Sequence, residues 1–514
     1  FRTERCTRRP PPPWLRSNRG IGIDSDFFQL GGHSLRATIL IARIHKAFDT
    51  RLPLQEIFTS PTVRGIAGYI KKNRKEEFAV ISPGEEREYY PLSPAQKRIY
   101  AVQQMDVRVA SYTWMMAVKL EGDLDIGRLR EVLTGLIRRQ ESLRTSFRVI
   151  NGEPVQEIAR GDVVPDIEEY TMTEEEAVRF VGESFVKPFD LSKVPLVRVG
   201  LITVGKKRYI MAVSLHHIDA DGSSVGILMK EFAQLYKGEV LPPLRLRYVD
   251  YCQWQTGAGQ KEIIKKQEKY WLKQYESGIP LLDMPTDFPR PVRQSFEGSS
   301  LRFRIDTGET QAIRVLLQKE DVTMYMFLLA VFNIFLAKVT GQEDIVVGSP
   351  VANRRHTDLE AIVGMFANVL AMRNFPRRDR TFRDFLAEIK KRTIAAFDNQ
   401  DYKLNDLLDR VMEQKDLARN SLFDAAFSLQ NMERPAVEMG GLRMTPIEYP
   451  LWASRCDLTF VAFEINEEGN PHIRVEVEYS IKLFKPGTID VFIRVFNRVI
   501  ASVLRETGIR LQEI

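Results

Sequence analysis

The chain of 514 residues is 44% hydrophobic and 28% charged, which is typical of folded globular protein and excludes collagen, coiled-coil and wholly disordered classes. Its net charge of +6 lies mostly in residues 1–20, where six arginines accompany one glutamate, and the near-neutral remainder has no basic stripe typical of nucleic-acid binding. Three scattered cysteines exclude a disulfide framework and favour a reducing cytoplasm, and the longest apolar run, residues 324–338, is shorter than the roughly 20 residues of a membrane span.

The first part of the chain contains two different segments. Residues 1–20 include four consecutive prolines and no helical period, so we expect an aberrant or disordered N-terminus there. Residues 21–72 have the apolar spacing of a small helical unit. We expect one helix over 35–48 and two short helices over 54–58 and 63–70.

From residue 88 onward, helical and strand patterns alternate. Residues 73–87, just before, are charged and lack a period, which indicates a linker. A stretch with four prolines at 280–300 divides the alternating region and predicts two α/β lobes, over 88–279 and 280–514. The expected strands include 209–215, 344–347 and 472–479, and the expected helices include 131–138, 223–235, 324–336 and 382–400.

A glycine pair precedes a serine in the small helical unit, in the string DFFQLGGHSL over residues 26–35. The glycines permit a sharp turn, and Ser34 then begins a helix whose positive end favours a phosphate ester. Taken alone, Ser34 could equally be a helix N-cap. The whole string resembles the peptidyl carrier (thiolation) domain of nonribosomal peptide synthetases. That resemblance covers residues 21–72 and implies a helical bundle with a 4′-phosphopantetheine arm on Ser34; the family's first helix has no counterpart in residues 1–20.

Two adjacent histidines follow the expected strand at 209–215. His216 and His217 stand at its end, and Asp221 and Gly222 follow immediately before a helix. Imidazole suits proton transfer near neutral pH, and a carboxylate could orient it. Without further evidence, the pair could also be polar loop residues, and a metal site is disfavoured because no third ligand has recognisable spacing.

The string HHIDADG over residues 216–222 resembles the HHxxxDG motif of condensation domains, a superfamily that includes chloramphenicol-acetyltransferase-like acyltransferases. Other motifs of nonribosomal condensation domains occur in family order, at residues 93–100, 139–147, 188–196, 248–254, 363–368, 399–402 and 419–422. The sequence departs from the family at Gln140, usually His, at Lys403-Leu404, usually Pro-Phe, at Ala418, usually Ser, and at Ser223, usually a larger residue.

The combined resemblance implies an α+β protein, in which a small helical-bundle carrier precedes a two-lobed α/β condensation domain. The implied reaction is nonribosomal amide-bond formation, as in antibiotic biosynthesis. The amine of an aminoacyl group on a downstream carrier attacks a donor thioester on the arm of Ser34. The implied partners are that acceptor carrier, an upstream adenylation domain and a phosphopantetheinyl transferase, all in the cytoplasm. Epimerization of a carrier-bound thioester is the alternative activity, and a non-catalytic docking module is the alternative outside enzymes.

The resemblance also implies a role for each site residue. His217 faces the substrate as general base or as a hydrogen-bond partner of the amine, whereas His216 turns into the protein. Asp221, beside Gly222, is structural in the family and pairs with an arginine of the segment at 139–147. Arg139 is the first candidate for that arginine and Arg144 is the second.

Overall fold

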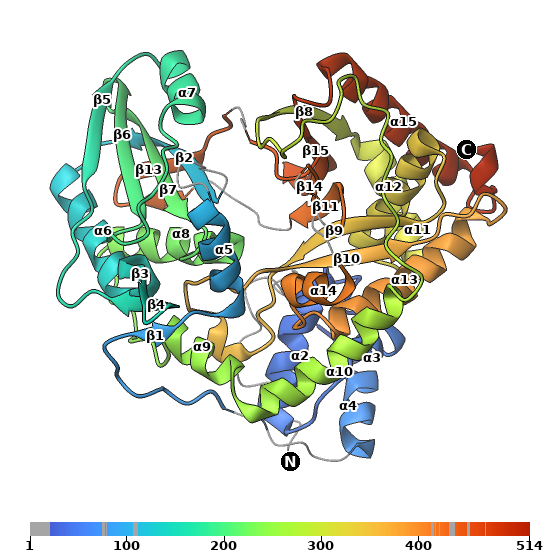
Figure 1. Cartoon of the computed structure of the whole chain (residues 1–514), viewed down its shortest axis with the longest axis horizontal. Coiled ribbons are helices and arrows are strands. Elements are labelled where there is room, and N and C mark those ends of the chain that lie inside the picture. Colours follow the sequence, from blue (N-terminus) through green and yellow to red (C-terminus); the bar gives the residue numbers. More distant parts are fainter. Residues whose placement is uncertain are drawn as a thin grey trace.

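The computed structural model describes residues 21–73, 78, 80–105, 112–412, 416, 418–420, 422–430, 437–449, 453–467 and 469–514. The prediction for residues 1–20 lies outside this range. Figure 1 shows two lobes side by side, with a group of short helices from the beginning of the described chain beneath the second lobe.

The N-terminal unit is helical, as its spacing predicts. It consists of α2 (Ser34–Phe48), α3 (Leu54–Thr59) and α4 (Val63–Lys72). The side chain of Thr62 caps α4 by accepting a hydrogen bond from the Gly65 amide. Buried Phe27, Ile57 and Phe58 belong to one apolar cluster that continues into the second lobe, so the unit packs against that lobe.

The first lobe is built on a six-stranded sheet in the order β12-β13-β2-β7-β6-β5. Helices α6 and α8 pack together over one apolar cluster of this sheet, and α7 contributes to another cluster with β6 and β7. A small sheet in the order β1-β4-β3 adjoins it. In chain order the elements of this part of the chain are β1 (Tyr90–Pro91), α5 (Pro94–Met105), β2 (Thr113–Gly122), α6 (Ile126–Arg139), η2 (Glu141–Arg144), β3 (Thr145–Ile150), β4 (Glu153–Ile158), β5 (Ile167–Thr171), α7 (Glu174–Glu183), β6 (Val197–Gly205), β7 (Arg208–His216), α8 (Gly222–Tyr236) and α9 (Tyr248–Gln255). Helix α10 (Ala258–Gln274) follows and packs against the second lobe through Trp271.

The second lobe has its own six-stranded sheet in the order β10-β9-β11-β14-β15-β8. Helix α12 is buried all round from Met324 to Leu336, because α11, α13, α15 and the sheet surround it. In chain order the elements after residue 280 are β8 (Gly298–Ile305), α11 (Thr307–Glu320), α12 (Met324–Thr340), β9 (Ile345–Val351), η3 (Thr357–Leu359), β10 (Asn368–Asn374), α13 (Phe382–Asp398), α14 (Leu404–Val411), β11 (Ala425–Gln430), β12 (Val437–Met439), β13 (Leu442–Pro446), β14 (Leu458–Glu467), β15 (Asn470–Ser480), α15 (Pro486–Arg505) and η4 (Leu511–Glu513), of which β12 and β13 belong to the first lobe's sheet.

Two strands that come after residue 280 belong to the sheet of the first lobe. Strands β12 and β13 follow β11 in sequence, yet β13 pairs antiparallel with β2 of the first lobe, with Met444 opposite Leu120. The chain then returns to the second lobe as β14, which pairs in parallel with β11. Two connections therefore link the lobes here, one on each side of the β12–β13 hairpin.

No single helix among the described residues is long and apolar enough to cross a membrane. Helices α11 and α12 meet the length and composition criteria only as a pair, which is bent by 104°.

Candidate functional site

The histidine pair lies where β7 ends beside β2 and β6. His216 is opposite Thr113 of β2, and the amide of His217 donates to the carbonyl of Tyr112 over 2.7 Å. The amide of Ile218 donates to Nδ1 of His216. Strand β7 ends at His216, as the pattern predicts, and both imidazoles are buried.

Burial determines the protonation of the pair. Burial and, to a smaller extent, the nearby positive charge of Arg455 together lower the pKa of His217 to about 3, against the smaller opposing effect of Asp221. Burial and Arg455 also lower the pKa of His216 to about 4. Both imidazoles are therefore neutral at physiological pH.

The turn after the histidines carries a buried carboxyl group, that of Asp219. The amide of Asp219 donates to the carbonyl of His216, which closes the turn. Burial raises the pKa of Asp219 well above its usual value, and neither carboxyl oxygen has a hydrogen-bond partner among the described residues. No described residue bonds this side chain, and the carboxylate that organises the site is that of Asp221.

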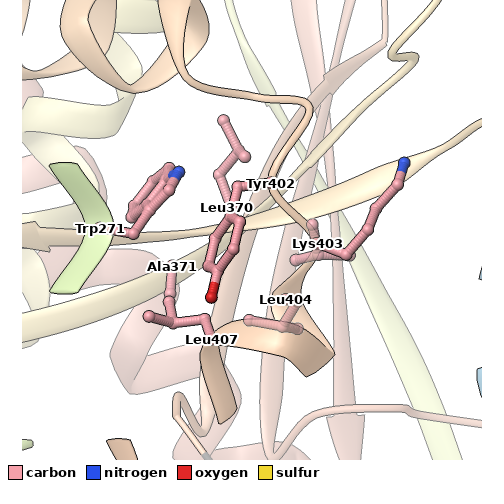
Figure 2. Close-up of a pocket in the computed structure, with 8 residues that line it drawn as sticks. Trp271, Leu370, Ala371, Tyr402, Lys403, Leu404 and Leu407 are labelled. Carbon is pink, nitrogen blue, oxygen red and sulfur yellow. The ribbon is translucent and has the colours of Figure 1, made fainter. Parts of the chain in front are cut away.

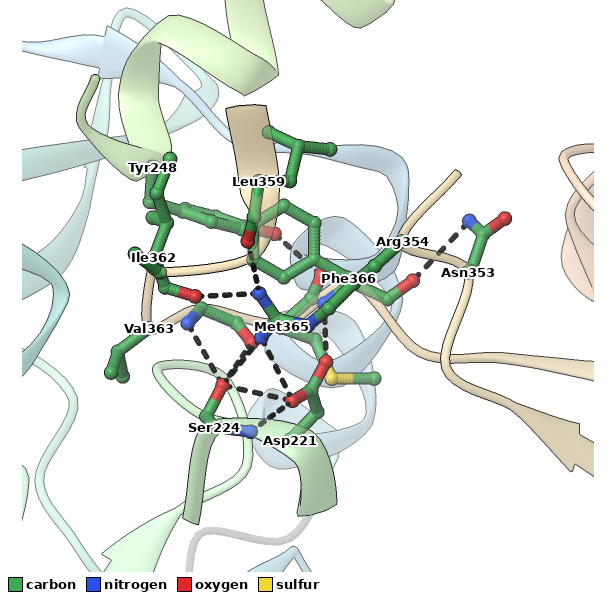
Figure 3. Close-up of polar contacts among 12 residues, drawn as sticks. Asp221, Ser224, Tyr248, Asn353, Arg354, Leu359, Ile362, Val363, Met365 and Phe366 are labelled. Atoms are coloured by element: carbon green, nitrogen blue, oxygen red, sulfur yellow. Dashed lines mark hydrogen bonds and ion pairs between the residues drawn. The ribbon is translucent and has the colours of Figure 1, made fainter. Parts of the chain in front are cut away.

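Asp221 bonds the first lobe to the chain segment that joins β9 to β10. It caps α8, because Oδ1 accepts hydrogen bonds from the amide and the hydroxyl of Ser224, each over 2.8 Å. Its Oδ1 also accepts from Nη2 of Arg354 over 3.2 Å, and its Oδ2 accepts from the amide of Phe366 over 3.1 Å. Figure 3 shows these contacts converging on one carboxylate. Asp221 therefore links the histidine loop to a distant segment of the chain.

The predicted partner of Asp221 is wrong. Arg139 instead bonds the Glu231 carboxylate over 2.9 Å, because both project from helices α6 and α8, which pack together. Arg144 bonds Glu141 within the short helix η2. Arg354, which sequence reasoning did not select, holds Asp221 in a pair with side chains 8% and 1% exposed.

Gln140 stands where the family usually has histidine, and both the nitrogen and the oxygen of its side-chain amide are hydrogen-bonded. Its side chain donates to the carboxylate of Glu231 and to the carbonyl of Ala361, and it accepts from the amide of Val363. The departure thus contributes to the contact between the first lobe and the β9–β10 connection. Gly222, by contrast, begins α8 in open space. A Cβ added to this residue would meet no neighbouring side chain within 4 Å, so nothing in the described structure sterically requires glycine there.

Arg455 is a second cation that sequence reasoning missed. It lies on the connection between β13 and β14, where the chain returns to the second lobe. Its guanidinium lies over the ring of Tyr112 at 5.5 Å, and the carbonyl of Tyr112 is the partner of the His217 amide. Arg455 stands three residues before the strand that begins at Leu458, and only the return of the chain brings it to the histidines.

Two cavities lie outside the histidine pair, and neither is lined by His216 or His217. One of about 590 Å³ is bounded by Tyr100, Phe147 and Phe189, and the ring of Phe189 meets the ring of His216 edge-on at 6.0 Å. The other, of about 10 Å³, lies between Trp271 and Tyr402 in the second lobe (Figure 2). It is large enough only for about one water molecule, so it cannot hold a substrate.

The family departure at Lys403-Leu404 lies beside the small cavity. Leu404 lines the cavity, whereas the ammonium of Lys403 points away from Trp271 and Tyr402 (Figure 2). Burial lowers the pKa of Lys403 to about 8, although Asp401 and Asp406 act in the opposite direction. This departure therefore lies in the packing of the second lobe.

The N-terminal unit presents a phosphate-compatible helix start at Ser34. Gly31 has a φ of +86°, and a Cβ on Gly32 would lie 2.4 Å from the ring and the carbonyl of Phe27. Both glycines are therefore required for the approach to α2. The first turn of α2 holds Arg36 and no acidic residue, so its charge and the positive end of the helix dipole suit a phosphodiester. No group of three potential metal ligands occurs in the part of the chain that the structure describes.

Comparison with protein families identifies two matched regions. The model described as "Condensation domain" matches residues 86–514, and the model described as "Phosphopantetheine attachment site" matches residues 15–70. Tyrocidine synthase 3 of Brevibacillus parabrevis is 44% identical over 96% of this chain, and gramicidin S synthase 2 of Brevibacillus brevis is 41% identical over 96%. The chain spans only 8% and 11% of the lengths of those two proteins.

Solved structures agree on the fold. The X-domain from teicoplanin biosynthesis has a TM-score of 0.77 at 22% identity, covering 85% of this chain and 99% of that one. The first condensation domain of the calcium-dependent antibiotic synthetase, in complex with substrate analogue 3a, has a TM-score of 0.69 at 18% identity, covering 84% and 99%. At these identities the likeness concerns the fold alone. The predicted fold class and the phosphopantetheine attachment site are confirmed.

Proposed function

This chain belongs to the condensation-domain family of nonribosomal peptide synthetases, which form peptide bonds, and from that premise we propose which groups it joins and which residues act. The donor acyl or peptidyl group is carried on Ser34, and the acceptor is an aminoacyl group on a separate downstream carrier. The observation that carries this proposal is the occurrence of both matched regions on one chain, with the attachment site first.

The proposed division of the chain follows the sequence pattern. The carrier comprises residues 21–72, the linker 73–87, and the two lobes 88–279 and 280–514. An upstream adenylation domain supplies the donor amino acid, a phosphopantetheinyl transferase attaches the arm, and the reaction takes place in the cytoplasm. The match to synthetases that are many times longer than this chain supports such partners.

When attached, the phosphopantetheine arm would supply the thiol that holds the donor as a thioester. The C–N bond to the acceptor amine would form as the C–S bond breaks, and the proton lost by the nitrogen would leave with the sulfur as a thiol. A thioester is already activated, so the chain mainly has to align the two groups and manage one proton. His217 is the proposed catalytic residue. His216 is the proposed support behind it, because its Nδ1 accepts the Ile218 amide and its ring packs against Phe189.

The low pKa of His217 favours one of its two possible roles. Because burial lowers this pKa to about 3, the imidazole is neutral and accepts a hydrogen bond, but it binds a full proton only weakly. We therefore assign His217 the role of positioning the attacking amine through a hydrogen bond. Arg455 supports this role, since its positive charge disfavours protonation of the imidazole and favours negative charge developing on the carbonyl oxygen.

Asp221 and Arg354 are proposed as positioning residues. They bond each other and fix the loop between β7 and α8, and neither needs to touch the substrate. Asp221 is a helix cap, which supports a structural role over direct participation in proton transfer.

The test loads a donor dipeptide on Ser34 and supplies an aminoacyl acceptor carrier, followed by mass spectrometry and chiral analysis of both proteins. We expect an elongated peptide on the acceptor carrier. An epimerised donor that stays on Ser34 would support the alternative activity, epimerization. No change in either protein, with the arm attached, would support a docking module and contradict catalysis.

A further inference from the structure

One short segment of the second lobe contacts both the carrier and the histidine loop. It is the connection between β9 and β10, residues 352–367, which includes the helical turn η3 at Thr357–Leu359. Its acidic middle faces the carrier, and its two ends hold Asp221.

The carrier contacts this segment through the C-terminal half of α2. Arg43 forms a bidentate pair with Glu360, with Nη2 to Oε2 at 2.7 Å and Nε to Oε1 at 3.1 Å. Lys46 bonds Asp358 over 2.7 Å, and the side chain of Asp358 is only 3% exposed. These cations lie nine and twelve residues after Ser34, about 14–18 Å along the helix. The contact therefore holds the end of α2 that is remote from the attachment site.

The ends of the same segment hold the histidine loop. Arg354 bonds Asp221 and the hydroxyl of Ser224, and the Gly364 amide donates to that hydroxyl over 3.1 Å. The Phe366 amide completes the contact with Asp221, and the Arg354 guanidinium lies 4.0 Å from the centre of the Phe366 ring.

Arg354 also joins the two contact regions. Its Nη1 donates to the carbonyls of Leu359 and Ile362 over 2.8 and 2.6 Å, while its Nη2 bonds Asp221. Leu359 lies between Asp358 and Glu360 in the chain, so the turn that meets the carrier is bonded to the guanidinium that holds the histidine loop (Figure 3). Displacement of this turn cannot leave the position of Arg354 unaffected.

We propose that the acidic turn containing Asp358 and Glu360 is a docking surface for the basic end of α2 of this chain's own carrier, and that docking there stabilises the loop carrying His217. The inference rests on the proposed function in taking the carrier as the donor arm. The ion pairs to Arg43 and Lys46 exist only in the docked arrangement, so they supply the free-energy difference that such coupling requires. Coupling of this kind is reciprocal: loosening the histidine loop weakens docking by the same factor.

The test is hydrogen–deuterium exchange of the full chain, followed by mass spectrometry of peptides covering 212–226 and 353–366. Arg43→Glu and Glu360→Arg each replace the ion pair with two like charges. We expect each to raise exchange in both peptides by about threefold to tenfold, the size expected for an exposed pair that becomes repulsive. The exchanged pair, Arg43→Glu with Glu360→Arg, should restore the wild-type rates.

Arg64→Glu provides the matched control. Arg64 is an exposed arginine of the same carrier and pairs with Asp24 inside it, so this change alters the same charge without touching the second lobe. It should leave both peptides unchanged. Unchanged exchange in both single variants, an equal rise in the control, or no recovery in the exchanged pair would overturn the proposal.

Exchange is measured without any substrate, so the two proposals can fail separately. A chain that forms no peptide bond yet shows the expected exchange pattern would contradict the proposed function and leave the docking surface standing. Glu360→Arg lies outside the carrier, so its effect cannot arise from unfolding of the carrier.

Discussion

Replacing Asp221 with asparagine should destabilise the first lobe and its contact with the β9–β10 connection. The carboxylate accepts four hydrogen bonds, three at Oδ1 from Ser224 and Arg354 and one at Oδ2 from the Phe366 amide. An asparagine side chain has one oxygen and one NH₂ group, so its NH₂ must face the donors of one of the two positions. Placing the oxygen at the Oδ1 position keeps three hydrogen bonds and loses only the one from the Phe366 amide. The change also leaves the buried charge of Arg354 uncompensated. Breaking a buried pair in this way costs about 3–5 kcal/mol, and the three hydrogen bonds retained at the single oxygen place the loss near the lower end, about 3 kcal/mol.

The assay combines urea unfolding with the rate of bond formation for Asp221→Asn, Arg354→Met and the double variant. Because the two residues contact each other, the double variant should lose about 1–3 kcal/mol less than the sum of the single losses. Arg139→Ala is the control: it removes a bond to Glu231, so its effect should add to that of Asp221→Asn within about 0.5 kcal/mol. An Asp221→Asn protein of wild-type stability whose pH–rate profile has moved would refute the structural role, as would coupling to Arg139 in place of Arg354.

Four further predictions concern the attachment site and the histidine pair. Ser34→Ala should gain no mass on treatment with a phosphopantetheinyl transferase and coenzyme A, and a gain in intact mass would contradict the assignment. His217→Ala should lower the rate of bond formation by about 10²–10⁴-fold, whereas His216→Ala should mainly lower the melting temperature; equal rate losses at matched stability would contradict these roles. Arg455→Met should raise the pKa of both imidazoles, because the cation opposes their protonation, and should move their NMR titration to higher pH. Arg455→Lys should preserve the wild-type titration, as should Arg443→Met, an exposed arginine earlier on the same return of the chain; a shift in either would count against Arg455. Since the pKa of His217 is about 3 and that of His216 about 4, the unfolded chain binds more protons below about pH 6.5, and stability falls as the pH is lowered from there to 4. His217→Gln should reduce this slope by about 1.4 kcal/mol per pH unit, and an unchanged slope would show that the folded imidazole is not neutral.

Local pattern was sufficient to predict the histidine loop. The apolar run before His216 is a strand because it lies inside a sheet, and α8 begins at the glycine after Asp221, where the carboxylate caps it. The apolar run at 324–336 predicts a buried helix, because a helix that is apolar on every face must be surrounded by other elements. Each of these features has a sequence signal within a few residues, although the surrounding sheet or helices supply the packing.

Long-range partners could not be read from the sequence. Arg139 and Arg354 are equally plausible partners of Asp221 by residue type, and only the packing of α6 against α8 assigns the former to Glu231. Arg354 is 133 residues from Asp221, and the bond forms because the β9–β10 connection reaches the first lobe. Strand β13 poses the same problem, since its pairing with β2 crosses the lobes and leaves no local signal. Arg455 is brought to the histidines by that same crossing.

The most direct test of peptide-bond formation by this chain is a single-turnover transfer with a labelled donor on Ser34, in which the intact mass of both proteins is followed over time. We expect the label to leave this chain and to appear on the acceptor carrier in equal amount, and His217→Ala to slow both changes together. A label that remains on Ser34, or that is released to solution without reaching the acceptor carrier, would contradict transfer by this chain.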